Sequence, residues 1–181
     1  KVLKRAEAIS PDDPVILFQT GSIYYFKNDP KYASYFDRLY NSVRKDDNEY
    51  TKYIKAFKLL MDYHFSKKNY QRSLEISEQI QSRENDYEAI LTAARSSHYL
   101  GKHEESLLFF SKISLSSNGD RLLLAGSYAA TGRKEQAIEL LKSLKYDQKA
   151  YSEAKKDRLL APLIKDIDKA TGQSNSGQTT N

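Results

Sequence analysis

A pattern of small and aromatic residues recurs along the chain, and it constrains the fold more than any local motif does. In its clearest copy a small residue is followed by Tyr three positions later, Gly four positions after that, and Ala a further five positions on. The copies are Ala125, Tyr128, Gly132 and Ala137; Gly21, Tyr24, Asn28 and Ala33; and, more weakly, Ala94, Ser97, Gly101 and Ser106. Repetition at roughly 30–35 residues is typical of stacked helical units. The sequence therefore predicts a surface that binds other molecules.

Between these landmarks, apolar residues recur at three- and four-residue spacing, which predicts helices. The expected helices span 14–27, 30–44, 49–67, 69–83, 86–100, 103–115, 120–131 and 134–145, followed by a last pair at 147–158 and 159–170. Residues 1–13 read as the second helix of a truncated preceding repeat, so we expect the chain to be a fragment of a longer protein. Residues 172–181 contain only Gly, Ser, Asn, Gln and Thr, and this composition predicts a disordered tail.

These residues resemble the tetratricopeptide repeat (TPR) family, whose helix–turn–helix unit places a small residue, Tyr, Gly, Ala, an aromatic and Pro at set distances. The resemblance covers about residues 1–146, and the unit that begins at Asp120 matches best. It implies an all-α, right-handed superhelical solenoid with TPR-like repeats over 14–146. Residues 147–171 are then the C-terminal capping helices that such arrays need.

Several positions depart from the family pattern. The unit that begins at Pro14 has Asp37 where an aromatic residue is expected, and the unit that begins at Asp86 has Ser97 in place of Tyr. The unit near 54–84 is degenerate, with Met61, His64 and Ser73 at pattern positions. The predicted array is therefore irregular.

Proteins of this family usually bind peptides or partner domains on a concave face lined by the first helix of each unit. The outward residues of those helices here are Phe18, Ser22, Tyr25, Lys58, Asp62, Phe65, Leu91, Arg95, His98 and Tyr99. Aromatic side chains beside Lys58 and Arg95 would suit an extended or helical segment with hydrophobic anchors and an acidic group. An alternative role for Phe18 and Phe65 is packing between units.

Signals for catalysis are weak. The three histidines are His64, His98 and His103, and their spacing does not place two metal ligands on one helical face. The sequence has no Gly-rich phosphate loop and no nucleophile-elbow pattern. We therefore predict no catalytic residues, no metal site, no cofactor and no small-molecule substrate. The predicted function is that of a non-catalytic adaptor or scaffold, which binds a protein or peptide partner within a multi-protein assembly.

A second hypothesis comes from the net charge of +5. Lysines and one arginine cluster near several tyrosines at Lys52, Lys55, Lys58, Lys67, Lys68 and Arg72. Such a cluster could attract RNA or another anionic polymer, although a solvated helix face explains it more simply and makes nucleic acid an unlikely partner. Polymer binding should weaken steeply with salt, whereas binding through Phe18, Tyr25 and Leu91 should persist.

The compartment is left open by the composition. The chain has no Cys, which fits a reducing cytoplasm as well as a bacterial periplasm, and a scaffold role in a bacterial envelope is one special case. No stretch of 18 apolar residues occurs in the sequence, so we expect no membrane span in this fragment. The oligomeric state is not predicted.

Overall fold

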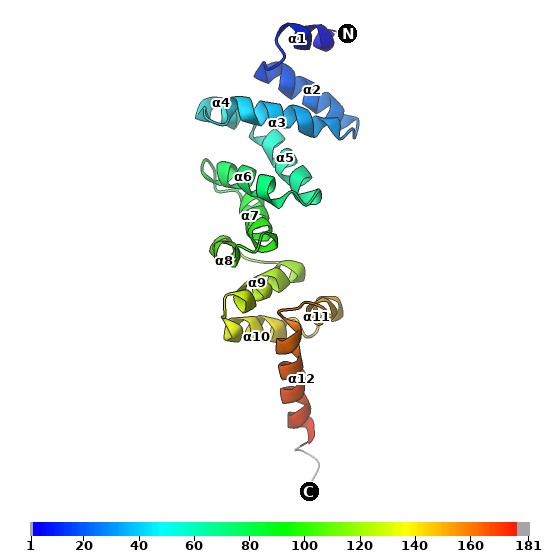
Figure 1. The fold of residues 1–181 in the computed structure, drawn as a ribbon, viewed down its shortest axis with the longest axis vertical. Helices are drawn as coiled ribbons and strands as arrows, with labels where there is room; N and C mark the ends of the chain where they lie inside the picture. The colour runs from blue at the N-terminus through cyan, green and yellow to red at the C-terminus, as the bar shows by residue number, and fades with distance from the viewer. Residues whose placement is uncertain (1, 177–181) are drawn as a thin grey trace. The chain divides into compact units, whose positions relative to one another are not determined.

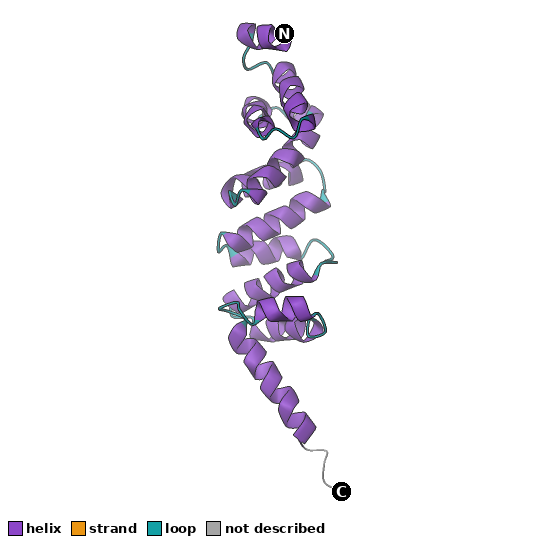
Figure 2. Ribbon diagram, turned by 90° about the vertical axis from the view of Figure 1, so that its right-hand side faces the viewer, coloured by secondary structure: helices purple, strands orange, loops and turns teal. Residues whose placement is uncertain are grey.

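The computed structural model describes the backbone of residues 2–176 and the side chains of residues 5–169, and all regular structure in the described part is helical (Figures 1 and 2). The helices are α1 (Val2–Ile9), α2 (Pro14–Phe26), α3 (Lys31–Val43), α4 (Asp47–Lys52), α5 (Ile54–Ser66), α6 (Tyr70–Gln81), α7 (Tyr87–Tyr99), α8 (His103–Phe110), α9 (Asn118–Ala130), α10 (Lys134–Ser143), α11 (Gln148–Ala154) and α12 (Ala161–Ser176). The all-helical fold class predicted from the sequence is confirmed.

The chain forms two compact units, residues 1–96 (unit 1) and 97–181 (unit 2). In unit 1, α2 packs against α3 and α5 against α6, while α3 also contacts α5. In unit 2, α9 packs against both α8 and α10, and the last two helices lie on this group, α11 on α9 and α12 on α10. Helices that are neighbours in the sequence therefore pack as neighbouring pairs within each unit.

Four helix-to-helix turns share one backbone geometry. Each contains a residue in the left-handed region, and these residues are Asn28 (φ 54°), Lys68 (φ 60°), Gly101 (φ 75°) and Gly132 (φ 80°). In each turn the following residue donates its N–H to the carbonyl five positions earlier, as Asp29 does to Tyr24, over N···O distances of 2.8 to 2.9 Å. This is the Schellman arrangement that closes a helix end. The landmarks that recur in the sequence thus mark a backbone feature that recurs in the structure.

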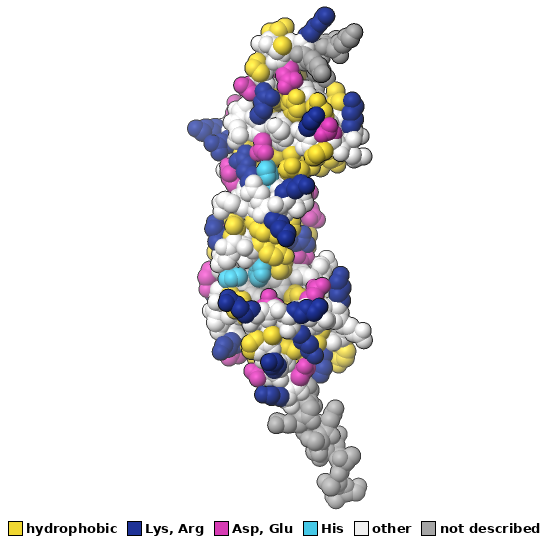
Figure 3. Space-filling model, turned by 45° about the vertical axis from the view of Figure 1, so that its right-hand side comes forward, with side chains coloured by type: hydrophobic (Ala, Val, Ile, Leu, Met, Phe, Trp, Pro, Cys, Tyr) yellow, Lys and Arg dark blue, Asp and Glu magenta, His cyan; other side chains and the backbone are white. Residues whose placement is uncertain are grey.

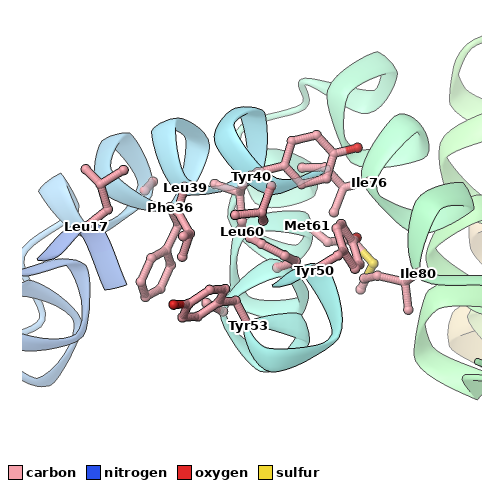
Figure 4. Close-up of a cluster of buried hydrophobic side chains, with 14 of the residues drawn as sticks. Leu17, Phe36, Leu39, Tyr40, Tyr50, Tyr53, Leu60, Met61, Ile76 and Ile80 are labelled. Carbon is pink, nitrogen blue, oxygen red and sulfur yellow. The ribbon is translucent and has the colours of Figure 1, made fainter. Parts of the chain in front are cut away.

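The core of unit 1 contains aromatic side chains such as Tyr40, Tyr50 and Tyr53 among aliphatic ones (Figure 4). The rings of Tyr50 and Phe57 lie 4.5 Å apart between centroids, and the ring of Tyr40 meets that of Phe57 edge-on at 5.4 Å. All three side chains are fully buried. Each ring of this kind buries on the order of 150–250 Å². The abundant tyrosines of this Trp-free chain therefore supply core volume as well as surface.

The core of unit 2 is built from smaller side chains. Ala125 of α9 and Ala137 of α10 are fully buried, and Leu141 fills the space beside them. Side chains from the last part of the chain, Leu160 and Ile164 among them, complete the cluster. Small residues at the α9–α10 contact allow the two helices to pack closely, and the C-terminal helices cover the apolar residues that this pair would otherwise expose.

Several helix boundaries differ from those predicted, α11 for example ending at Ala154 instead of 158. The helix expected over 49–67 is split at Tyr53 (φ −112°, ψ 10°) into α4 and α5. This break turns the Tyr53 ring into the core, where it is 8% exposed. Helix α8 ends at Phe110 instead of 115. Helix α12 continues to Ser176, into the segment expected to be disordered, because each residue added to an existing helix gains a hydrogen bond. The rest of that segment, 177–181, lies outside the described residues.

Candidate functional site

The aromatic residues predicted to line a groove on unit 1 differ in solvent exposure. Phe18 is half-buried, and its ring lies 5.3 Å from that of Tyr53 and 6.4 Å from that of Phe36. Phe65 is also half-buried and meets Tyr70 edge-on at 5.4 Å. Tyr25 is 38% exposed. Of these aromatic residues, Tyr25 therefore offers the clearest surface to a partner, while the Phe18 and Phe65 rings contribute to packing within the unit.

The charged residues predicted for the groove are engaged with neighbours. Lys58 places its Nζ 2.7 Å from a carboxylate oxygen of Asp86 and 2.7 Å from one of Glu84. Hydrogen bonds to Asp86 and then to Glu84 raise the pKa of Lys58. The pKa of Asp62 is also raised, because neighbouring side chains remove water from its carboxylate and Glu88 adds negative charge. Lys58 therefore has little free charge to offer an anionic ligand.

Two further predicted residues of unit 1 lie on α7. Leu91 was expected to face outward but is only 5% exposed. The reason is that α7 is buried on several sides, since every residue over 89–94 is buried. Arg95 is half-buried, and Ser22 on α2 is likewise partly exposed. The prediction that Leu91 faces outward is therefore wrong.

The two predicted residues of unit 2 are His98 and Tyr99. The Nδ1 atom of His98 lies 2.9 Å from the Ser127 hydroxyl, and its ring packs on the backbone at Gly126. Burial lowers the pKa of His98, and the nearby His103 lowers it further. Tyr99 is 50% exposed and packs edge-on against the His98 ring. His98 is thus a packing residue of unit 2, while Tyr99 stays open to solvent.

The structure adds a site that the sequence prediction missed, at the edge of unit 1 where two Schellman turns lie. A hollow of about 320 Å³ opens there, and we call it the turn-edge hollow. Its lining residues are Tyr25, Asn28, Pro30, Tyr32, Tyr63, Ser66 and Lys67. Tyr25 belonged to the predicted groove and the other six did not. The sequence signal that could have identified the site is the placement of tyrosines beside the turns at Asn28 and Lys68.

The tyrosine rings at the hollow are arranged edge-to-face. The rings of Tyr25 and Tyr32 lie 5.3 Å apart at 84°, and those of Tyr32 and Tyr63 lie 5.6 Å apart at 74°. Phe26 extends this series at the end of α2, 5.9 Å from the ring of Tyr25, and is 81% exposed. Edge-to-face pairs are favourable and hold the rings in fixed orientations. The hollow therefore has preformed aromatic walls and an exposed aromatic rim.

Cationic side chains surround these rings. The Nζ atom of Lys67 lies 5.8 Å from the centre of the Tyr63 ring, and the exposed Lys27, Lys31 and Lys68 belong to the same two turns or their flanks. Burial raises the pKa of Tyr32, and Tyr63, Tyr25 and Asp62 raise it further. The Tyr32 hydroxyl therefore keeps its proton at neutral pH and can act as a hydrogen-bond donor. Figure 3 shows hydrophobic and cationic side chains interspersed on one face of unit 1.

Three of the six residues in the basic cluster considered for polymer binding are paired with carboxylates. Lys52 pairs with Glu49, and Lys58 pairs with two carboxylates as described above. Arg72 binds the Asp37 carboxylate through Nε at 3.1 Å and Nη2 at 2.8 Å. The cluster therefore does not form a continuous unpaired cationic stripe.

Among the described residues, His, Asp and Glu side chains form no group of three or more that could hold a metal ion. None of the helices between residues 2 and 176 has the length and apolar character needed to cross a bilayer. Comparison with protein-family models gives no match, and comparison with curated protein sequences gives none either. Function is therefore inferred from the side chains described above.

Proposed function

We propose that the chain is a TPR-like repeat array that acts as a non-catalytic adaptor or scaffold and binds a protein partner. The proposed architecture is a right-handed solenoid with α11 and α12 as its C-terminal cap. Two observations support it, namely helices that pack as neighbouring pairs within each unit and four turns with the same Schellman geometry. Arrays of this kind expose extended surfaces that bind other macromolecules.

The observation that carries the proposal is the exposed aromatic rim of the turn-edge hollow. Phe26 is 81% exposed and stands beside the 38% exposed Tyr25. Aromatic residues are enriched in the buried centres of protein interfaces, where a few of them carry most of the binding energy. The proposed contact surface keeps Tyr25 from the predicted groove, adds Phe26, Tyr32 and Tyr63, and assigns Phe18, Leu91 and His98 to packing.

Site-specific photo-crosslinking in cells that express the chain tests this proposal. A photoreactive phenylalanine analogue at Phe26 should crosslink to a defined partner in high yield. The matched control places the same analogue at Tyr146, which is 93% exposed in unit 2. That position should give low yields and a different set of products. Equal yields of the same products from both positions would indicate nonspecific capture and contradict the proposal.

The partner found in this way should then be purified and its affinity for the chain measured. Tyr25→Ser combined with Phe26→Ser should weaken binding by at least about tenfold, the usual effect of losing an aromatic interface centre worth more than 1.4 kcal/mol. The control is Tyr146→Ser, which removes a tyrosine ring that is more exposed than either Tyr25 or Phe26. It should leave the affinity within about twofold. An unchanged affinity in the double variant would place the contact elsewhere on the chain.

A further inference from the structure

The aromatic rings that line the turn-edge hollow are steeply tilted against one another and do not form a flat surface. Successive tyrosine rings meet at 84° and 74°, so the edge of one ring faces the plane of the next. A flat nucleic-acid base stacks best on an open aromatic face, and crossed rings leave little such face free. A ridged apolar ligand, whose projecting groups enter the angles between rings, matches this shape better.

The hollow also offers hydrogen-bond donors. These donors are the hydroxyls of Tyr25, Tyr32 and Tyr63, whose side chains line it. The rings that carry these hydroxyls follow one another at centroid distances of 5.3 Å and 5.6 Å. A ligand that suits them presents acceptors at its surface. The polyproline II helix does so, because it makes no internal hydrogen bonds and its carbonyl groups remain unpaired.

The charge around the hollow favours an acidic ligand. Lys67 lines the hollow, and the adjacent Lys68 and the turn residue Lys27 are exposed. Of the nearby carboxylates, that of Asp29 is engaged, since its Oδ1 accepts a hydrogen bond from the backbone N–H of Lys31 at 2.9 Å. The carboxylate of Asp62 acts electrostatically on Tyr32 and is a single negative charge against these three lysines. Lysine side chains that remain hydrated add orientation and selectivity more than affinity. An acidic residue beside the apolar segment would complement them.

We infer that the turn-edge hollow binds a proline-rich, extended segment of the partner that carries an acidic residue next to its prolines. Proline rings would enter the angles between the tyrosine rings, peptide carbonyls would accept from the tyrosine hydroxyls, and the acidic side chain would lie against Lys67. Aromatic-lined grooves recognise proline-rich peptides in this way because the ligand is already ordered before it binds. This inference rests on the proposed function and names the chemistry of the partner at that same surface.

Fluorescence anisotropy with synthetic peptides tests the inference on the purified chain. The probe is a labelled run of eight prolines with two glutamates at each end. Two matched peptides carry lysines at the ends, or alternating glycine and serine in place of the prolines. We expect the glutamate-flanked proline peptide to bind at least about tenfold more tightly than either matched peptide.

Conservative variants separate a binding role from a structural one. Tyr32→Phe and Tyr63→Phe keep the packed rings and remove only the hydroxyls, so each should weaken peptide binding by about 2–12-fold, the range for one hydrogen bond. Lys67→Gln should reduce the preference for glutamate over lysine ends, because Lys27 and Lys68 remain. Tyr146→Phe is the matched control and should change nothing.

Three results would overturn the inference. They are the absence of peptide binding, equal affinity for the glycine–serine peptide, and tighter binding of a single-stranded RNA oligomer that weakens in Tyr63→Phe. If partner crosslinking at Phe26 persists while the peptide does not bind, the inference fails and the proposed function stands. If neither the crosslink nor the peptide complex forms, both fail.

Discussion

Gly21 shows at the scale of a single residue how closely α2 and α3 approach each other. A Cβ atom at this position would lie 2.5 Å from Cε1 and 2.7 Å from Cδ1 of Phe36, and 3.2 Å from Cβ of Tyr35. The Phe36 side chain is only 1% exposed and has little room to move aside. The small residue at this point of the repeat is therefore required by packing.

Gly21→Ala should destabilise the chain for this reason. Overpacking a core typically costs about 1–3 kcal/mol, and the better helix propensity of Ala offsets up to about 1 kcal/mol of that. We expect the free energy of unfolding to fall by about 1–2 kcal/mol in urea denaturation followed by circular dichroism. Gly119→Ala is the control, because its Cβ would meet only the Ser117 hydroxyl, at 3.4 Å. A Gly21→Ala variant as stable as that control would contradict the packing argument.

At the scale of helices, Asp37 and His64, two residues that depart from the predicted pattern, contact each other. The Asp37 carboxylate of α3 lies 3.0 Å from Nε2 of His64 on α5 and binds the Arg72 guanidinium of α6. Burial alone would raise the pKa of Asp37, but hydrogen bonds from His64 and Arg72 hold it below its ordinary value. One polar network thus links α3, α5 and α6 of unit 1.

The contact between His98 and Ser127 in unit 2 makes the stability of the folded chain depend on pH. His98 of α7 is neutral in the folded chain because burial lowers its pKa, His103 lowers it further, and Asp157 opposes them weakly. The unfolded chain therefore binds more protons between the folded and unfolded pKa values of this residue. The free energy of unfolding should fall as pH drops below about 6.5, the unperturbed value for His.

Denaturation at pH 7.5 and at pH 5.5 measures this effect. The difference in unfolding free energy between the two pH values should be smaller in His98→Gln than in the wild type, since the amide can keep a hydrogen bond to Ser127 and does not titrate. A nuclear magnetic resonance titration of the His98 ring should give a midpoint below that of an unfolded peptide. Identical pH dependence in the two proteins would show that His98 does not couple folding to protonation.

At the scale of the whole molecule, the salt dependence of binding distinguishes a protein-binding function from an anionic-polymer-binding one. Because Lys52, Lys58 and Arg72 are already paired with carboxylates, partner binding should lose no more than about fivefold in affinity between 50 and 200 mM salt. A single-stranded polymer held by five lysines would lose on the order of 100-fold over that interval. Affinity of the purified partner, measured at both concentrations, gives the answer. A loss as steep as that of the polymer would favour the anionic-polymer hypothesis.

The local part of the fold could be predicted from the sequence, and the site could not. Helix periodicity and turn residues such as Gly101 and Gly132 act over a few neighbours, so their pattern is readable along the chain. The turn-edge hollow instead brings together Tyr25 of α2, Tyr32 of α3 and Tyr63 of α5. Their proximity depends on how helix pairs pack. The sequence alone does not distinguish these tyrosines from Tyr40, which is buried in the core.

The four Schellman turns differ in the type of residue at the left-handed position. Both left-handed positions of unit 2 are glycines, whereas those of unit 1 are Asn28 and Lys68. A left-handed residue with a Cβ costs roughly 1–2 kcal/mol, less for Asn. In unit 1 these turns frame the hollow, and the Asn28 side chain lines it. Glycine at both positions would relieve this strain but would also remove the Asn28 side chain from the hollow, so a more stable backbone would come with the loss of a lining residue.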